Sequence, residues 1–223
     1  MNFLEKLLAS LLAGAVFICL GISLLAALNK KEVPTINSTE TGVGPIVRLH
    51  FASSGRFFCS GTVISNNRVV TAGHCAAAAA GLMGIIKDDI IVKSNTDMII
   101  DSKARALSGD PRTDQGMVEG DFSRALKYSI VTDPTKNIEL WKSDKLLSCG
   151  YPFGGKLFCI PITGARQYNF GWAGHSYLYP GMSGGPVFDL RSGLVVGINS
   201  AVGEENSLFA TTLEIFNNLG ITP

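Results

Sequence analysis

From Ile46 onward, short apolar segments alternate with turn-forming residues. The first half contains IVRLHF, FFCSGTVIS and RVVTA, and the second half contains KLFCIPITGAR, GPVFD and LVVGINSAV. Apolar runs of this length, rich in Val, Ile, Phe and Thr and bounded by Gly, Asn or Pro, are typical of β-strands. Helix-period patterns are scarce after residue 40. Two sets of about six strands predict an all-β fold made of two packed six-stranded antiparallel barrels.

Other parts of this region are less regular. Residues 76–81, which are alanines closed by a glycine, predict a short helix. The stretch 102–120 is polar and is expected to form a surface loop, after which DFSRALKYSIV is expected to begin another strand at Asp121. Net charge is +1 and no long basic run occurs. The charge pattern therefore gives no electrostatic basis for nucleic-acid binding.

The N-terminal part of the chain is suited to a membrane. Leu7 to Leu28 contains 22 residues without a charge. About 20 apolar residues are enough to cross the hydrocarbon core as a helix. A cleaved signal peptide is the alternative, but its cleavage site would be poor because Ala26-Ala27-Leu28 ends in leucine. We therefore expect an N-terminal transmembrane helix in residues 1–32, a linker in residues 33–43 and a single domain in residues 44–223.

Two short motifs carry groups suited to nucleophilic catalysis. The first is Thr71-Ala72-Gly73-His74-Cys75, and the second is Pro180-Gly181-Met182-Ser183-Gly184-Gly185-Pro186. Glycines around a serine let its hydroxyl project from a turn, and they let the N–H groups of Gly181 and Ser183 point at one spot where an oxyanion is held. Taken singly, each motif also suits a structural role, as a half-buried histidine beside a disulfide and as a plain turn.

Together, TAGHC and GMSGGP resemble the chymotrypsin-like (trypsin-fold) serine proteases, over residues 44–215. The resemblance implies that His74 is the general base and Ser183 the nucleophile, with no cofactor and no metal. The family order His, Asp, Ser places the triad acid between them, and Asp121 fits the family pattern best, with Asp101 and Asp114 in reserve. Met182 stands where zymogen-activated relatives have aspartate, so the chain looks closer to bacterial Deg-type proteases, glutamyl endopeptidases and viral members.

The resemblance also implies which residues contact substrate. The stretch before Ser183 and the strand after it line the family's primary pocket, which here gives Tyr177, Asn199, Ser200 and Val202. Because Tyr177 replaces the acidic residue of trypsin-like pockets, a preference for Lys or Arg is not expected. Val202 stands where an open pocket usually has glycine, which favours small or medium side chains.

Four of the five cysteines are expected to form disulfides. The resemblance pairs Cys59 with Cys75, while Cys149 and Cys159 stand at equal distances from a turn and should face each other across a hairpin. A metal site is the alternative, but the chain has no Cys-x-x-Cys and only three histidines. Two disulfides indicate an oxidising compartment, and hence an extracytoplasmic domain. Cys19 lies in the apolar segment.

The sequence therefore predicts a membrane-anchored serine endopeptidase that acts on protein or peptide substrates through an acyl-enzyme. The alternative is a catalytically silent trypsin-fold binding module at the membrane. Intact His74, Asp121 and Ser183 favour the enzyme.

Overall fold

The computed structural model describes residues 46–82, 87–110, 113–127, 134–142, 145–168, 171–202 and 207–211. All of them belong to one compact unit, Ile36–Pro223. The expected anchor (1–32) and linker (33–43), with Cys19, lie outside the described residues. Within the described part of the chain, no helix is long and apolar enough to cross a membrane.

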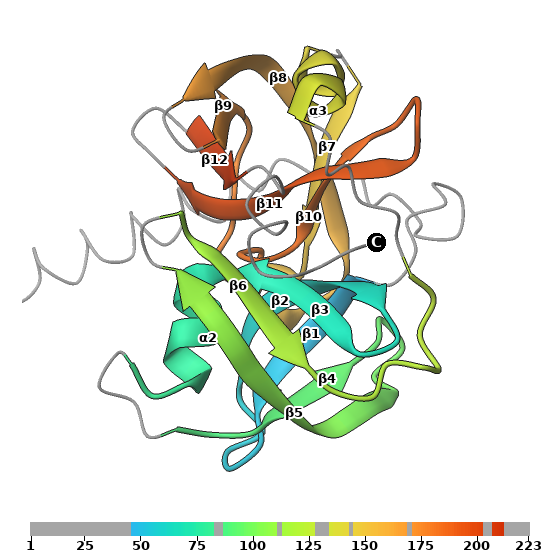
Figure 1. Ribbon diagram of the computed structural model, residues 1–223, viewed down its shortest axis with the longest axis vertical. Helices are drawn as coiled ribbons and strands as arrows, with labels where there is room; N and C mark the ends of the chain where they lie inside the picture. Colours follow the sequence, from blue (N-terminus) through green and yellow to red (C-terminus); the bar gives the residue numbers. More distant parts are fainter. Residues whose placement is uncertain are drawn as a thin grey trace, which may run out of the picture. The chain divides into compact units, whose positions relative to one another are not determined.

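Six antiparallel strands close the first barrel, drawn blue to green in Figure 1. They are β1 (Ile46–Phe51), β2 (Phe57–Ser65), β3 (Arg68–Ala72), β4 (Ile90–Lys93), β5 (Ile99–Asp110) and β6 (Gln115–Glu119). Their order around the barrel is β1-β2-β3-β6-β5-β4. A short helix, α2 (Gly73–Ala79), follows β3, as the alanine-rich sequence predicts.

A second closed barrel, drawn yellow to red in Figure 1, contains the remaining strands in the order β10-β11-β12-β9-β8-β7. They are β7 (Leu146–Gly150), β8 (Phe158–Tyr168), β9 (Gly171–His175), β10 (Pro186–Asp189), β11 (Leu194–Val202) and β12 (Ser207–Thr211). The helix α3 (Pro134–Trp141) precedes this barrel, and the 3-10 turn η1 (Pro152–Gly154) connects β7 to β8. The all-β prediction with its two six-stranded barrels is confirmed for the described residues.

Each barrel has its own apolar core, and a third cluster joins them. Tyr151 belongs to this third cluster together with Ile46 of the first barrel. The Tyr151 hydroxyl donates a hydrogen bond to the carbonyl of Ile46 at 2.8 Å, and the Arg48 guanidinium lies 5.2 Å from its ring centroid. Burial raises the pKa of the Tyr151 phenol well above its usual range, so the hydroxyl remains a donor at all ordinary pH values. This side chain therefore fastens the β7–β8 connection to β1.

The structure corrects the expectation for residues 102–127. Residues 102–120 contain most of β5 and all of β6, and no strand begins at Asp121 within 121–127. In β5, Ala104 is fully buried while Lys103 and Arg105 are exposed. An antiparallel strand with one solvated face carries such polar residues, and they obscured the strand in the sequence.

Both expected disulfides are present. Cys59–Cys75 joins β2 to α2, and Cys149–Cys159 links two directly paired residues of β7 and β8. By the loop-entropy argument, closing loops with sequence separations of 16 and 10 residues stabilises the fold by about 3 kcal/mol each. The first bridge ends at Cys75, next to His74, and the second closes the hairpin that contains the β7–β8 turn.

Candidate active site

His74 lies in the first turn of α2, directly after β3. Its side chain is 42% exposed, although the neighbouring Gly73 and Cys75 are buried. The disulfide from Cys75 to Cys59 fixes this turn against β2. The imidazole is thus held by a rigid backbone while its ring remains accessible, as a general base requires.

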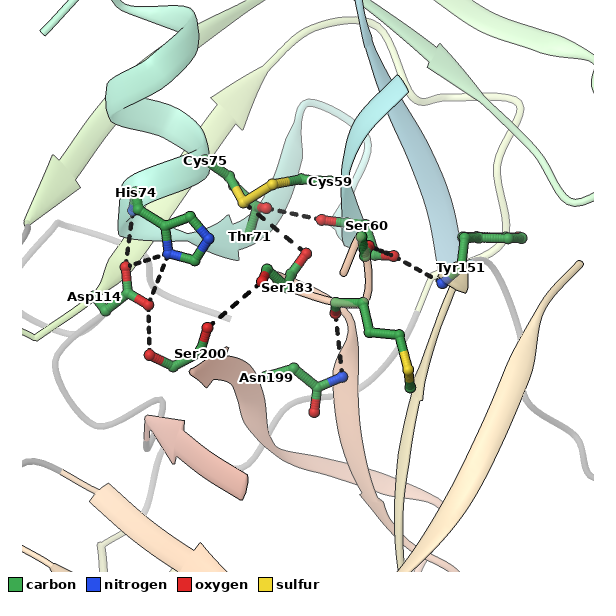
Figure 2. Close-up of a disulfide and its surroundings, with 12 residues drawn as sticks. Cys59, Ser60, Thr71, His74, Cys75, Asp114, Tyr151, Ser183, Asn199 and Ser200 are labelled. Carbon is green, nitrogen blue, oxygen red and sulfur yellow. Dashed lines mark hydrogen bonds and ion pairs between the residues drawn. A yellow bond between two sulfur atoms is a disulfide. The ribbon is translucent and has the colours of Figure 1, made fainter. Parts of the chain in front are cut away.

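Asp114 is the carboxylate that faces this histidine. Its Oδ1 accepts the His74 backbone N–H at 2.8 Å, and Nδ1 of the ring lies 3.0 Å from Oδ1 and 3.1 Å from Oδ2. The Ser200 hydroxyl of the second barrel donates to Oδ2 of the same carboxylate (Figure 2). With Nδ1–H donating to Asp114, the Nε2 atom of the ring is left as the acceptor that a base needs.

The prediction of Asp121 as the partner of His74 is wrong. The Asp121 side chain is exposed, and its Oδ1 accepts the backbone N–H of Ser123 at 3.1 Å. The strand register gives the physical reason, because Gln115 of β6 pairs with Ala72 beside His74 while Glu119 pairs with Arg68. At about 3.3 Å per residue, Asp121 lies beyond the far end of the strand, roughly 20 Å along the chain from Asp114.

Asp101 was the other reserve candidate for the triad acid. Its carboxylate accepts the backbone N–H groups of Lys103 and Asp121, and no hydrogen bond joins it to His74 among the described residues.

A local signal for Asp114 was present in the sequence. A glycine follows two positions later, and apolar Met117 and Val118 follow the glycine. A Cβ on Gly116 would lie 2.6 Å from the Ala72 carbonyl and 2.7 Å from Cβ of Ala76, so only glycine lets β6 approach β3 and α2 this closely. Asp114 itself has a φ of 49°, a left-handed conformation that aspartate tolerates better than most residues.

Ser183 lies in a tight turn that precedes β10. Gly181 and Gly184 in this turn have φ values of 94° and 83°, which favour glycine. A Cβ on Gly184 would also lie 2.0 Å from the Thr71 hydroxyl of the first barrel. The Ser183 hydroxyl donates to the Ser200 carbonyl at 3.5 Å, and no hydrogen bond joins it to His74 in the described structure. In Figure 2 the His74 ring has Asp114 on one side and the Ser183 turn on the other.

The peptide units of the turn follow a regular pattern of hydrogen bonds. The Pro180 carbonyl accepts the Phe153 N–H at 2.8 Å, and the Met182 carbonyl accepts the Gly185 N–H at 3.0 Å. A trans peptide directs its N–H opposite to its carbonyl, so these bonds fix the directions of the Gly181 and Ser183 N–H groups. Neither of these two N–H groups has an acceptor among the described residues. They are the pair that the sequence predicts as oxyanion donors.

Asn199 and Ser200 have roles other than the predicted substrate contacts. Asn199 is fully buried, and its amide donates to the Cys149 carbonyl at 2.7 Å and to the Met182 carbonyl at 3.3 Å, while it accepts from the Ser148 hydroxyl at 2.8 Å. Ser200 is buried too, and its hydroxyl holds Asp114. The Asn199 side chain therefore supports the backbone of the Ser183 turn, and the Ser200 side chain supports the carboxylate that faces His74.

The other two predicted substrate contacts are Tyr177, which precedes the turn in the chain, and Val202 of β11. Tyr177 is 49% exposed, with its ring centroid 4.6 Å from that of Tyr179. Val202 ends β11, where it pairs with Leu208, and its side chain lies outside the described residues.

One group among the described residues brings three potential metal ligands together, namely Cys59, His74 and Cys75. Both sulfurs are consumed by the disulfide, which leaves no thiolate to bind an ion. The proximity is therefore a consequence of the bridge beside the histidine.

Two β-barrels with a histidine–carboxylate pair and a glycine-bounded serine define a chymotrypsin-like serine endopeptidase as the class of this protein. Residues 59–198 match the family model described as a trypsin-like peptidase domain. The chain therefore belongs to that family, whose substrates are proteins or peptides. No match was found among the curated proteins.

Solved structures with the same fold are HtrA-type and other bacterial proteases. The Rv3671c protease from M. tuberculosis, in its active form, aligns with a TM-score of 0.60 at 19% identity, over 84% of this chain and 88% of that chain. The serine endoprotease from Yersinia pestis aligns with a TM-score of 0.60 at 20% identity, over 85% and 66%. The HtrA-type protease AlgW with tripeptide gives 0.62 at 18% identity, over 83% and 62%. At these identities the likenesses show a shared fold.

The ionisation of Asp114 should contribute to stability. Burial raises the pKa of this carboxyl, but the hydrogen bonds from His74 and Ser200 lower it more, so the net pKa lies below its usual value. A carboxyl whose pKa is depressed by folding stabilises the native state above the unfolded pKa of about 3.9, and this contribution disappears as pH falls through the folded pKa. We expect the gap in free energy of unfolding between wild type and Asp114→Asn to narrow as pH falls below about 4. Urea unfolding at several pH values measures the gap, and a constant gap contradicts the assignment.

Proposed function

We propose that this chain hydrolyses peptide bonds with Ser183 as nucleophile, His74 as general base and Asp114 as the acid that orients the base. The observation that carries the proposal is the two-point contact between Asp114 and His74, beside a serine turn in which two N–H groups have no acceptor among the described residues. Rotation about the Cα–Cβ bond of Ser183 is the movement that brings its hydroxyl from the Ser200 carbonyl toward Nε2. Catalytic hydrogen bonds are often long or misaligned before substrate binds.

The reaction then proceeds in two halves. His74 takes the Ser183 proton as the oxygen attacks the substrate carbonyl, and it returns this proton to the leaving amine as the C–N bond breaks. Water enters, gives a proton to His74 and attacks the acyl-enzyme carbonyl. The ester C–O bond then breaks, the new carboxyl end of the product leaves, and His74 returns the proton to the Ser183 oxygen. In both halves the N–H groups of Gly181 and Ser183 stabilise the negative carbonyl oxygen. Asp114 remains ionised and stabilises the imidazolium.

The triad proposal is tested by fluorophosphonate labelling and peptide hydrolysis with the full chain. Ser183→Ala and His74→Ala should abolish labelling, and Asp114→Asn should lower kcat roughly 1,000- to 10,000-fold, because the ring loses its orienting anion. Asp121→Asn is the matched control, and it should change kcat less than about twofold. A large loss in Asp121→Asn together with an active Asp114→Asn would overturn the assignment of the acid. A folded wild type that is never labelled would favour the binding module.

We also propose a preference for uncharged substrate side chains, based on the residues that the family resemblance assigns to the primary pocket. We place Tyr177 and Val202 at the position of the side chain that precedes the cleaved bond. Tyr177 offers an aromatic surface and a hydroxyl but no negative charge, which gives a Lys or Arg side chain no ion pair there. Small or medium apolar side chains suit this surface better.

This specificity is measured with peptides that differ only at the residue before the cleaved bond. We expect kcat/KM to be at least about tenfold higher for Ala or Val than for Lys or Arg. The variant Tyr177→Asp should raise kcat/KM for the Lys peptide, relative to the Ala peptide, by about tenfold. A tenfold change corresponds to about 1.4 kcal/mol of transition-state stabilisation. Leu190→Asp adds the same charge at the other end of β10 and should leave the ratio unchanged. Efficient Lys cleavage by wild type would contradict the proposal.

We further propose that residues 1–32 anchor the protein and that its peptidase domain lies in an extracytoplasmic, oxidising space. The uncharged segment 7–28 and the two disulfides support this placement. The anchor would confine cleavage to substrates at or near the membrane.

The anchor and the compartment are tested on the full chain in cells. It should sediment with membranes and resist alkaline extraction, and a variant with Val16→Arg and Leu20→Arg should not, because each charge costs about 3 kcal/mol at the membrane centre. Denatured without reductant, the full chain should expose one thiol, that of Cys19. Five reactive thiols would contradict the oxidising compartment, and a mature N-terminus near residue 29 would show a cleaved signal instead of an anchor.

A further inference from the structure

Ser60 of β2 makes two hydrogen bonds with the Ser183 turn. It is fully buried in the first barrel and directly follows Cys59. Its N–H donates to the Ser183 carbonyl at 2.9 Å, and its hydroxyl donates to the Gly181 carbonyl at 2.7 Å. The same hydroxyl accepts the Tyr151 N–H at 2.9 Å (Figure 2). One residue of the first barrel therefore holds two segments of the second.

The direction of these hydroxyl bonds is fixed by chemistry. A backbone N–H is only a donor and a carbonyl oxygen only an acceptor, so the Ser60 proton must point at Gly181 while its lone pair receives Tyr151. The Ser60 carbonyl is itself held, because it accepts the Thr71 hydroxyl at 2.8 Å. The hydroxyl has both partners satisfied and is not available to substrate.

The positions of these bonds within the turn are informative. Gly181 O and Met182 N belong to one peptide unit, and this unit is bonded at both ends, to the Ser60 hydroxyl and to the Tyr179 carbonyl at 3.0 Å. Ser183 O and Gly184 N belong to another such unit, bonded to the N–H of Ser60 and to the carbonyl of Asn199 at 2.8 Å. The unit that presents the Ser183 N–H lies between them. Ser60 thus fixes the peptide units on both sides of an oxyanion donor.

Gly181 is held through its backbone alone. It has no side chain, and a Cβ there would lie 2.6 Å from the Phe57 ring and 2.7 Å from the Tyr151 carbonyl. Glycine at a φ of 94° has access to many backbone conformations. Without the Ser60 hydroxyl, the partly buried Gly181 and the buried Tyr151 would each have a backbone group without this partner, and rotation of the peptide unit is one way to relieve the cost.

We propose that Ser60 is a positioning residue for the oxyanion site, whose hydroxyl keeps the Gly181 and Ser183 N–H groups aimed at one point. The inference rests on the proposed peptidase function and assigns a role within it to a side chain that touches neither substrate nor reacting atoms. A purely structural role is the competing explanation, and it predicts loss of stability without a specific loss of transition-state binding.

Thr62 provides a matched control. It lies two residues further along β2 and therefore on the same face of the strand. It is also fully buried, and its hydroxyl has no hydrogen-bond partner among the described residues. Ser60→Ala and Thr62→Ala each remove one buried hydroxyl from the same strand, but only the first removes a contact with the Ser183 turn.

The experiment uses the full chain, with active sites counted by fluorophosphonate titration and stability measured by urea unfolding. Removing one oxyanion donor outright costs about 100- to 1,000-fold in kcat, so its misalignment in Ser60→Ala should lower kcat about 10- to 100-fold with KM changed less than about twofold. Affinity for a peptide boronate, which resembles the tetrahedral intermediate, should fall by the same factor, whereas a product peptide should bind equally well. Thr62→Ala should keep kcat and boronate affinity. If Ser60→Ala does not fold, Ser60→Cys, which donates only weakly, replaces it with the same expectation.

The possible outcomes separate the two proposals. Unchanged kcat and boronate affinity in a folded Ser60→Ala would overturn the role of Ser60 and leave the peptidase intact. Equal losses of activity in Ser60→Ala and Thr62→Ala that follow their unfolded fractions would also overturn it. A folded wild type without Ser183 labelling would overturn the proposed function, and the role of Ser60 with it.

Discussion

Hydrogen bonds between the two barrels determine where the Ser183 turn lies relative to His74, and the candidate site depends on them. Ser60 belongs to the first barrel, and through it β2 holds the backbone on both sides of Ser183. Thr71 of β3 donates its hydroxyl proton to the Ser60 carbonyl and so supports Ser60 within the first barrel. The bond from Ser200 to Asp114 runs between the barrels in the other direction. A peptide group buried at such a junction is costly if it is left unpaired, so the barrels have one favoured arrangement. The position of the Ser183 turn relative to His74 therefore follows from the hydrogen bonds that these buried polar groups require.

The parts of this arrangement that are local in sequence could be predicted from it. The histidine turn and the serine turn are contiguous motifs whose glycines and small residues indicate a tight turn. Cys149 and Cys159 are neighbours across a single hairpin. Asp114 was different, because its partner is 40 residues away and the choice among carboxylates depends on which end of β6 faces β3. The polar solvent face of β5 concealed the hairpin that sets this register. Asn199 was predicted as a substrate contact, but its buried side chain bonds to Ser148, Cys149 and Met182, which no local pattern reveals.

Met182, which precedes Ser183, is uncharged, so the backbone of the Ser183 turn is held without an ion pair at this position. Met182 is fully buried and packs among Trp141, Leu146 and Ile162, so this position offers an apolar side chain and no partner for a buried ammonium group. Neutral groups orient the adjoining peptide units instead, namely the Asn199 amide and the N–H of Phe153. Because none of these groups titrates near neutral pH, folding alone sets the directions of the two oxyanion donors, with no later ionisation step. In the proposed mechanism, the charge that changes during the reaction is confined to His74 and the substrate oxygen, while Asp114 remains ionised.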